Sequence, residues 1–450
     1  MLKYDVVIVG AGPAGIFAAY ELTHKKKLSV LILEKGNDID KRTRGGSDIN
    51  VGWGGAGAFS DGKLNLSTEV GGWLNQCISE DALEKLIDYV DGLYIKFGSP
   101  NEISGSTNNI IVARLKRQAA LADLTLIPTR IRHLGTENCY RVLKNIREYF
   151  TGKVDVRVNT VAERILVEDG KAVGVETSEG ERISAQFVIV APGREGAEWL
   201  TNEARRLGLS LTANAVDVGL RLELPAPVLE PLTDYLYEPK LIYYSKSFDD
   251  KVRTFCVCPY GEVSVETYGE VLVVNGHSYK GRKTENTNFS LLVSTSFTEP
   301  FHEPIAYGKY IARLANLLGE GIIIQRLGDL QKGRRSTDER IKRGAVKPTL
   351  PQATPGDLSF VLPYRYLSDI LEMIQVIDKL TPGVNAPDTL LYGIEVKFYS
   401  SRLKLKSSLE SEVDNLYAIG DGAGITRGLV QASVSGTIAA RDILERVKKD

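Results

Sequence analysis

Residues 10–15, with the sequence Gly-Ala-Gly-Pro-Ala-Gly, constrain the fold of this chain more than any other stretch. They join a predicted strand at 4–9 to a predicted helix at 13–24. Glycines at these spacings allow a tight turn, the approach of a pyrophosphate to the backbone, and close packing of helix on strand. Glu34 ends the next predicted strand, 28–33, at the position where an acid binds ribose hydroxyls. The opening β-α-β unit therefore predicts a dinucleotide site on a parallel sheet.

The periodicity after this unit predicts two domains. Helices are expected at 81–97 and 137–150. Alternating segments then predict a three-stranded meander, at 154–158, 162–168 and 171–177. An apolar strand follows at 185–191, and 415–419 resumes the pattern of the first domain near the end of the chain. The segment between them is less regular, which predicts a second domain inserted into the first.

Composition excludes several classes of protein. The chain has 450 residues, more than one compact core usually holds, and a net charge of -1, which argues against a nucleic-acid partner. The richest basic cluster, at 332–343, is interrupted by acids and is interpreted as a solvated or substrate-facing loop. No stretch reaches the roughly 18 apolar residues of a membrane span. Four cysteines form no disulfide framework and no iron–sulfur spacing, so a cytoplasmic location is expected.

Two later motifs indicate which dinucleotide, NAD or FAD, the β-α-β unit binds. Ala191-Pro192-Gly193 ends the strand after the meander, and 416–424 reads Leu-Tyr-Ala-Ile-Gly-Asp-Gly-Ala-Gly. With residues 10–15, this set resembles the FAD-binding domain of the glutathione-reductase-like flavoprotein superfamily. The resemblance implies that Asp421 binds the ribityl–pyrophosphate part of FAD. It also implies that the helix starting near Gly428 points its N-terminus at the flavin, where a helix dipole stabilises negative charge.

The chain also resembles a narrower group, a widespread family of uncharacterised FAD-dependent dehydrogenases. The resemblance covers nearly the whole chain, and the matching stretches lie at 54–64, 133–137, 254–259, 274–279, 325–329 and 333–336. Family members often have glutamate where this chain has Asp421, which preserves the acid. The resemblance implies FAD redox chemistry and leaves the substrate open.

The motifs and the resemblance together imply a set of FAD-binding residues. Residues 45–62 contain no histidine or cysteine to which a flavin is usually attached, so FAD is expected to be non-covalent. The expected FAD-binding residues are Gly10, Gly12, Pro13, Ala14, Gly15, Glu34, Lys35, Arg44, Gly55, Ala56, Gly57, Ser60, Asp61, Gly62, Lys63, Val161, Ala191, Pro192, Gly193, Gly420, Asp421, Gly428, Leu429 and Val430. No metal site is expected.

Two missing motifs limit the electron source. No C-x-x-x-x-C pair follows the second strand, and no second G-x-G-x-x-G lies between residues 100 and 330. A dedicated nicotinamide domain is therefore not expected. Electrons come from the substrate, from a redox protein partner, or from NAD(P)H as a transient donor.

Few side chains are candidates for proton transfer and substrate binding. His133 and His277 are the candidate catalytic histidines, and the alternative for each is a hydrogen-bonded structural role. Arg335, with Arg334 beside it, is a candidate for binding an anionic substrate, and the alternative is a solvated arginine. Cys256 and Cys258 are either small buried hydrophobes or a redox dithiol.

The fold expected is α/β: a Rossmann-like FAD-binding domain, with a parallel sheet plus β-meander, and an inserted mixed α/β substrate domain. The first domain is expected to comprise 1–95, 135–208 and 385–450, and the second 96–134 and 209–384. The function expected is that of an FAD-dependent oxidoreductase, which transfers a hydride between flavin N5 and a small organic substrate. The alternatives are a flavoprotein electron carrier, an FAD-bound scaffold with a protein partner, or a flavin monooxygenase.

Overall fold

The computed structural model divides the chain into two compact units. It describes residues 2–25, 28–43, 49–105, 110–212, 214–268, 270–279, 281–297, 303–398 and 400–448. Unit 1 comprises Met1–Glu102, Arg132–Asn214 and Tyr399–Asp450, and unit 2 comprises Ile103–Ile131 and Ala215–Phe398. The sequence predicts the last boundary at 384/385, but the strand β19 (Leu390–Lys397) lies in unit 2 because it pairs with a strand of that unit.

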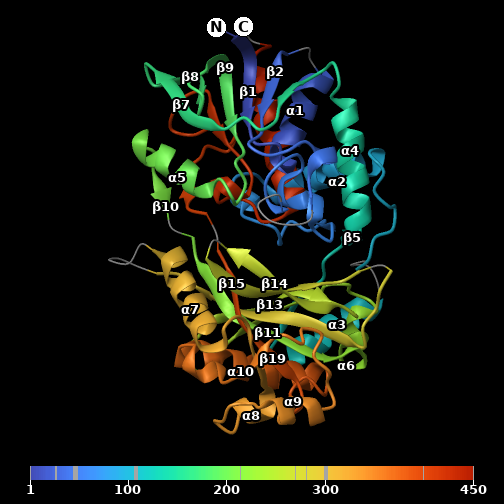
Figure 1. Ribbon diagram of the computed structural model, residues 1–450. Helices are drawn as coiled ribbons and strands as arrows, with labels where there is room; N and C mark the ends of the chain where they lie inside the picture. The colour runs from blue at the N-terminus through green and yellow to red at the C-terminus, as the bar shows by residue number, and fades with distance from the viewer. Residues whose placement is uncertain are drawn as a thin grey trace. The chain divides into compact units, whose positions relative to one another are not determined.

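Unit 1 is built on a mostly parallel sheet. Its strands β6 (Asp155–Arg157), β2 (Val30–Leu33), β1 (Leu2–Val9) and β9 (Arg182–Val190) are hydrogen-bonded in that order, and β21 (Leu416–Ala418) pairs with β9. Val7 stands opposite Leu31 on one side and Val188 on the other, all of them fully buried. Figure 1 shows β1 between β2 and β9. The mixed α/β fold expected from the sequence is confirmed.

An antiparallel meander extends this sheet beyond β9. Its strands are β7 (Ala162–Glu168), β8 (Lys171–Thr177) and β9. The tight turn between β7 and β8 falls at Asp169 and Gly170, whose φ angles are 48° and 76°. The segment 154–158, expected in the meander, instead forms β6 beside β2. This difference arises because β6 follows a helical crossover, which returns the chain parallel to β2.

Helices cover the sheet of unit 1. They are α1 (Pro13–Lys25), α2 (Glu80–Lys96), α4 (Thr136–Tyr149), α5 (Ala197–Arg206) and α11 (Leu429–Arg446). Helices α1 and α11 approach each other closely, since a Cβ atom on Gly436 would lie 2.1 Å from the Ala14 carbonyl oxygen. None of the described helices combines the length and apolar character needed to cross a bilayer.

A buried carboxylate holds the end of α11 in unit 1. Glu410 accepts hydrogen bonds from both terminal nitrogens of Arg446 at 2.7 Å, from Lys406 Nζ at 2.7 Å and from the Asn415 amide at 2.9 Å. Burial acts to raise the pKa of Glu410, but Arg446 and Lys406 outweigh it and lower the pKa to about 2. Glu410 is therefore charged across the ordinary pH range.

We expect Glu410→Gln to destabilise unit 1 by about 2 kcal/mol at neutral pH, after allowance for solvent screening around Arg446 and Lys406. The folded pKa lies below the unfolded one, so this stability is present above about pH 4.5 and is lost as the pH falls toward 2. Urea unfolding at neutral pH and near pH 3 checks the sign, because the two proteins should converge at the lower pH. The exposed Glu163→Gln is the control, with a change below about 0.5 kcal/mol. A constant difference at both pH values would contradict the assignment.

Unit 2 contains a second, mostly antiparallel sheet. Its strands run in the order β18 (Thr354–Pro355), β17 (Ile323–Arg326), β19, β11 (Val216–Pro225), β16 (Asn286–Thr295), β13 (Lys251–Cys258), β12 (Lys240–Tyr244) and β4 (Thr125–Ile127). The hairpin of β14 (Glu262–Tyr268) and β15 (Val271–His277) forms a separate small sheet. The helices of this unit are α3 (Ile110–Leu121), α6 (Ala226–Thr233), α7 (Pro304–Gly319), α8 (Leu327–Leu330), α9 (Asp338–Arg343) and α10 (Tyr364–Leu380).

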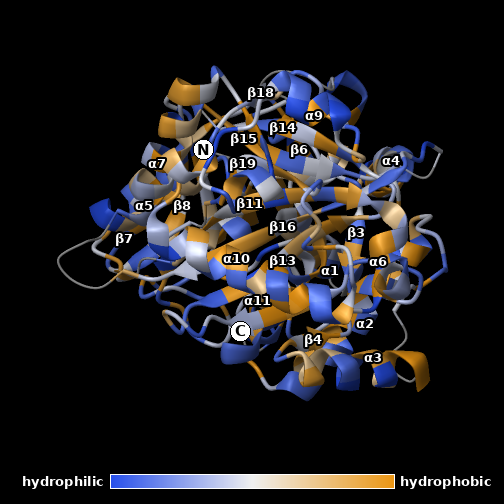
Figure 2. Cartoon of the chain, turned by 90° about the horizontal axis from the view of Figure 1, so that it is seen from below, coloured by the Kyte–Doolittle hydropathy of each residue, from blue (hydrophilic) through white to orange (hydrophobic). Residues whose placement is uncertain are grey.

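The core of unit 2 lies between its sheet and α10. Val218, Leu220, Leu291 and Val293 from β11 and β16 are fully buried in the same cluster as Met373 of α10. Figure 2 shows hydrophobic colour along β13 and β16 and alternating colours around α10, as expected for a helix with one face on a sheet.

Candidate functional site

A cavity of about 360 Å³ opens in unit 1 at the carboxyl ends of its parallel strands. Val9, Leu33 and Ala191, at the ends of β1, β2 and β9, line it, as does Gly420 after β21. In open α/β sheets this edge is where ligands bind, because the loops that follow neighbouring strands meet there.

The three glycines of residues 10–15 have different tasks around this cavity. A Cβ atom on Gly10, whose φ is +105°, would lie 2.2 Å from the Ala191 carbonyl oxygen, and one on Gly15 would lie 2.0 Å from the Gly10 oxygen. These two glycines therefore permit close backbone packing. A Cβ atom on Gly12 would meet nothing within 4 Å, and Gly12 lines the cavity. Its missing side chain leaves room for a ligand next to the N-terminus of α1.

Glu34 follows β2 and lies at the wall of the cavity. Its Oε1 accepts hydrogen bonds from the Gly36 and Gly52 amides, each at 2.9 Å, and its Oε2 accepts one from the Ala11 amide at 2.8 Å. A carboxylate offers about four acceptor sites, so capacity remains for a ribose hydroxyl. The side chain thus fixes three loops as well as presenting an acid to the cavity.

Arg42 positions the glycine-rich segment that forms another part of the cavity wall. Its Nη1 donates to the carbonyl oxygens of Trp53, at 2.6 Å, and Gly55, at 2.9 Å, and its guanidinium lies 4.8 Å from the centre of the Phe59 ring. Gly55 begins the short 3-10 helix Gly55–Phe59, whose Gly55, Ala56 and Gly57 line the cavity. Arg44, the arginine chosen from the sequence, lies outside the described residues.

Asp421 and the start of α11 complete the cavity. Asp421 Oδ1 accepts hydrogen bonds from Thr426 Oγ1 at 2.7 Å and from the Gly428 amide at 3.3 Å. Burial raises the pKa of Asp421 above its ordinary value, although Arg194 and these two hydrogen bonds act in the opposite direction. Gly428 and Leu429, at the N-terminal end of α11, line the cavity, so the positive end of this helix dipole lies at its wall.

Most of the residues expected to hold FAD line this one cavity. They are Gly10, Gly12, Pro13, Ala14, Glu34, Lys35, Gly55, Ala56, Gly57, Ser60, Val161, Ala191, Pro192, Gly193, Gly420, Asp421, Gly428 and Leu429.

Five further expected residues do not line the cavity as the described residues define it. Gly15 packs on Gly10, and Asp61 and Lys63 form an ion pair at 3.1 Å. The space beside Gly62 is filled by Cys139 and Leu134, and Val430 is buried in the core. A role for these residues in binding FAD remains a prediction.

Part of the cavity lining was not among the residues expected from the sequence. The missed residues are Val9, Leu33, Asn50, Val51, Thr160, Ala162, Arg194, Glu195, Gly196, Trp199 and Ala432. Arg194–Gly196 follow Ala191-Pro192-Gly193 directly, so extending that motif would have found them. Trp199 comes from α5, and no local pattern signals that its ring reaches the cavity.

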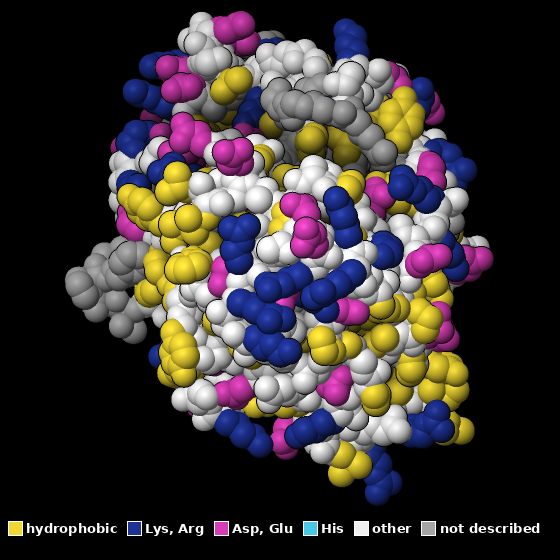
Figure 3. All heavy atoms as spheres, turned by 60° about the horizontal axis from the view of Figure 1, so that its bottom comes forward, with side chains coloured by type: hydrophobic (Ala, Val, Ile, Leu, Met, Phe, Trp, Pro, Cys, Tyr) yellow, Lys and Arg dark blue, Asp and Glu magenta, His cyan; other side chains and the backbone are white. Residues whose placement is uncertain are grey.

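The three candidate catalytic residues do not line the cavity as described. His133 ends β5 (Ile131–His133) and belongs to unit 1. His277 ends β15, and Arg335 is exposed between α8 and α9, both in unit 2. Figure 3 brings the α8–α9 end of Figure 1 forward and shows lysines and arginines gathered near its centre beside a few acids. The catalytic roles of all three residues stay predictions.

The residues present fit FAD. The space left by Gly12, the amides at the start of α1, the carboxylate of Glu34 and the start of α11 supply what a pyrophosphate, a ribose and an electron-rich ring need. Among the described residues, no group of histidine, cysteine, aspartate or glutamate has the arrangement of a metal site.

Comparison with known proteins agrees with this geometry. The model of the family described as FAD dependent oxidoreductase matches residues 5–252, and that described as FAD-dependent protein, C-terminal domain-like, matches 232–398. An uncharacterised protein of Clostridium beijerinckii is 31% identical over 99% of this chain and 81% of its own.

Solved structures are more distant. Glycine oxidase from Geobacillus kaustophilus is 14% identical, with a TM-score of 0.41, over 99% of this chain and 95% of its own. A 3-ketosteroid-delta4-(5alpha)-dehydrogenase from Rhodococcus jostii RHA1 is 14% identical, with a TM-score of 0.46, over 98% and 97%. Similarity of this degree says nothing about the substrate of this chain.

Proposed function

The chain belongs to the FAD dependent oxidoreductase family, and we propose that it transfers a hydride between flavin N5 and a small organic substrate. The observation that carries the proposal is one cavity at the strand ends of unit 1, which is lined by the glycine motif, Glu34, Asp421 and the start of α11. FAD, when bound, supplies a two-electron acceptor or donor.

The residues of the chain have separate proposed tasks in holding this group. Gly12 leaves room for the pyrophosphate, and the amides at the start of α1 donate to its oxygens. Glu34 accepts from a ribose hydroxyl, and Asp421 binds the ribityl–pyrophosphate part. The N-terminus of α11 favours negative charge at the cavity wall.

Proton transfer to or from the substrate is assigned to His133 or His277, because histidine exchanges a proton near neutral pH. Arg335 is assigned to an anionic group of the substrate, which its planar guanidinium can bind with two hydrogen bonds. NAD(P)H is proposed as a transient electron donor.

Anaerobic reduction of the purified protein tests the proposal. We expect a yellow protein with equimolar FAD whose visible absorbance is bleached by NADH, by NADPH, or by a member of a panel of small organic acids, amines and alcohols. After reduction with dithionite, oxidised small molecules such as activated alkenes are tested as acceptors. A colourless protein that refuses added FAD would contradict the cofactor site. A flavin that reacts only with a redox protein would contradict the proposal that the substrate is a small organic molecule.

Histidine variants separate binding from proton transfer. We expect His133→Gln or His277→Gln to slow the reaction between the flavin and the small-molecule substrate about 100-fold or more, while FAD content is unchanged. The exposed His24, at the end of α1, provides the matched control His24→Gln, which should react at the wild-type rate. Wild-type rates in both test variants would remove the two histidines from the mechanism.

A further inference from the structure

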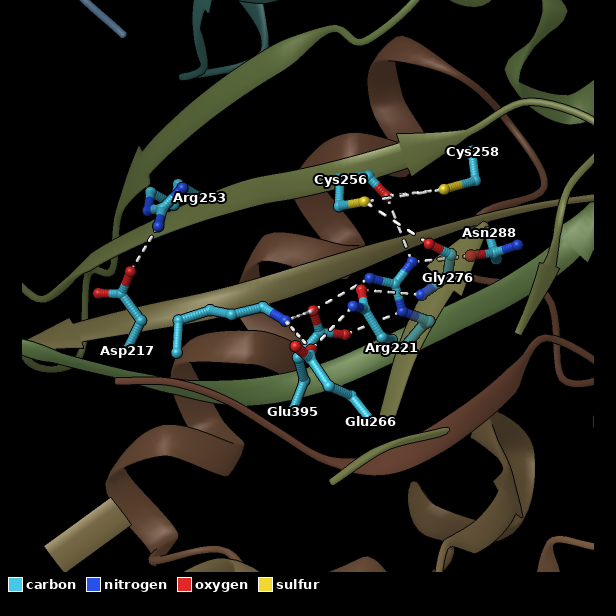
Figure 4. A network of polar contacts seen from close by, with 11 residues as sticks. Asp217, Arg221, Arg253, Cys256, Cys258, Glu266, Gly276, Asn288 and Glu395 are labelled. Carbon is cyan, nitrogen blue, oxygen red and sulfur yellow. Dashed lines mark hydrogen bonds and ion pairs between the residues drawn. The ribbon is translucent and has the colours of Figure 1, made fainter. Parts of the chain in front are cut away.

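Two cysteine sulfurs lie next to each other in unit 2. Cys256 and Cys258 both belong to β13, separated by one residue. Alternate residues of a regular strand are about 6.6 Å apart along the chain, which normally keeps their side chains from meeting. Here the two Sγ atoms are 3.8 Å apart, and Figure 4 shows them side by side.

A local distortion of β13 brings the sulfurs together. Cys256 has a φ of 45°, in the left-handed region, and the pairing with β16 shifts between Phe255 and Cys258. A non-glycine residue in this region is strained and persists only where its surroundings hold it. Arg221 Nη1 donates to the Cys256 carbonyl oxygen at 3.2 Å, and Cys258 Sγ lies 3.4 Å from the same oxygen.

The two thiols differ in access to solvent. Cys258 is fully buried, whereas Cys256 is only half-buried. The guanidinium of Arg221, itself fully buried, interacts electrostatically with both cysteines. A neighbouring cation favours the thiolate form, which is the nucleophile in disulfide exchange. The pair therefore combines a partly exposed cysteine with a fully buried one whose sulfur lies 3.8 Å from the sulfur of the first.

We propose that Cys256 and Cys258 form a redox-active dithiol that reduces small disulfides. The Cys256 thiolate attacks one sulfur of R–S–S–R and expels R–S⁻, which takes up a proton. Cys258 then attacks the Cys256 sulfur of the mixed disulfide, loses its proton, and expels the second R–S⁻. One protein disulfide forms and the small disulfide becomes two thiols, so two electrons pass from the cysteines to it. This reaction is independent of the flavin.

Glutathione disulfide serves as the probe for a test on the full-length protein. After incubation, free thiols are alkylated under denaturing conditions and counted, and the peptides are mapped by mass spectrometry. We expect the count to fall from four to two, with both missing thiols in the peptide containing Cys256 and Cys258. A dithiol reductant should restore all four.

Single variants test the order of attack. Cys258→Ser should accumulate a glutathione adduct on Cys256, and Cys256→Ser should react at least about 10-fold more slowly at Cys258, because that sulfur is buried. Cys77→Ser, at another half-buried cysteine, is the control and should still lose two thiols. A wild-type count that stays at four, or losses at Cys77 or Cys139 in place of the pair, would overturn the proposal. If the serine variants do not fold, the wild-type peptide map alone decides.

Discussion

Gly12→Val is expected to give a folded protein that no longer retains FAD, with a dissociation constant raised about 100-fold or more. This loss corresponds to about 3 kcal/mol of binding free energy. The reason is steric: Gly12 lines the cavity, and a Cβ atom there meets no protein atom within 4 Å. The added methyl groups therefore occupy space for the ligand and do not disturb the packing of the protein. A side chain on Gly10 or Gly15 would instead overlap with backbone atoms.

Equilibrium dialysis of the FAD-depleted protein against FAD measures the change, and circular dichroism checks the fold. Gly281→Val is the matched control, because Gly281 also has no atom within 4 Å of its Cβ position and no left-handed φ. It lies outside the cavity lining and should bind FAD as the wild type does. Wild-type affinity in Gly12→Val would show that FAD binds elsewhere.

Where the signal is local, the sequence predicts which residues line the cavity. Residues 10–15, Glu34 and Ala191-Pro192-Gly193 each follow a buried strand, so their position at one sheet edge follows from the parallel order of the strands. Arg42 and Trp199 were not predictable, because their tasks depend on which loops and helices the fold brings near them. Likewise, β6 was assigned to the meander, since a short strand does not reveal its partner in its own sequence.

The strands of unit 2 are harder to predict from the sequence, because polar residues interrupt the apolar pattern of its buried strands. Arg221 and Glu223 lie in β11, Gln325 in β17 and Glu395 in β19, all fully buried. Such residues break the apolar pattern that identifies a core strand. They are tolerated only where other buried groups satisfy them, and that requires contacts between strands far apart in the sequence.

Arg221 and Glu395 are the most deeply buried ion pair described in unit 2. Arg221 donates from Nε and Nη2 to the two carboxylate oxygens of Glu395, at 2.8 and 3.0 Å, and from Nη1 to Asn288 Oδ1 at 2.7 Å (Figure 4). Lys397 Nζ lies 3.2 Å from Glu395 and 3.7 Å from Glu266, so two cations face two carboxylates. Burial acts to raise the pKa of Glu395, but Arg221 and Lys397 outweigh it and hold the pKa below its ordinary value.

Glu395→Gln is therefore expected to destabilise unit 2 by about 3–5 kcal/mol, because it leaves a buried cation without its counter-charge. Hydrogen exchange in peptides from β11 and β19 measures the loss. Tryptophan fluorescence reports unit 1 separately, since Trp53, Trp73 and Trp199 all lie there. Fluorescence-detected unfolding of unit 1 should change far less than exchange in β11 and β19.

Two comparisons identify the buried charge as the cause. Glu270→Gln makes the same chemical change in an exposed pair of unit 2, where Glu270 lies 3.3 Å from Arg313, and should cost less than about 0.5 kcal/mol. The double variant Arg221→Met with Glu395→Leu removes one charge of each sign and leaves Lys397 opposite Glu266. It should recover most of the lost stability, because an apolar pair of similar volume avoids the cost of desolvating ions. A double variant as unstable as Glu395→Gln would instead assign the cost to lost packing around Asn288 and Cys256, the other two acceptors of Arg221.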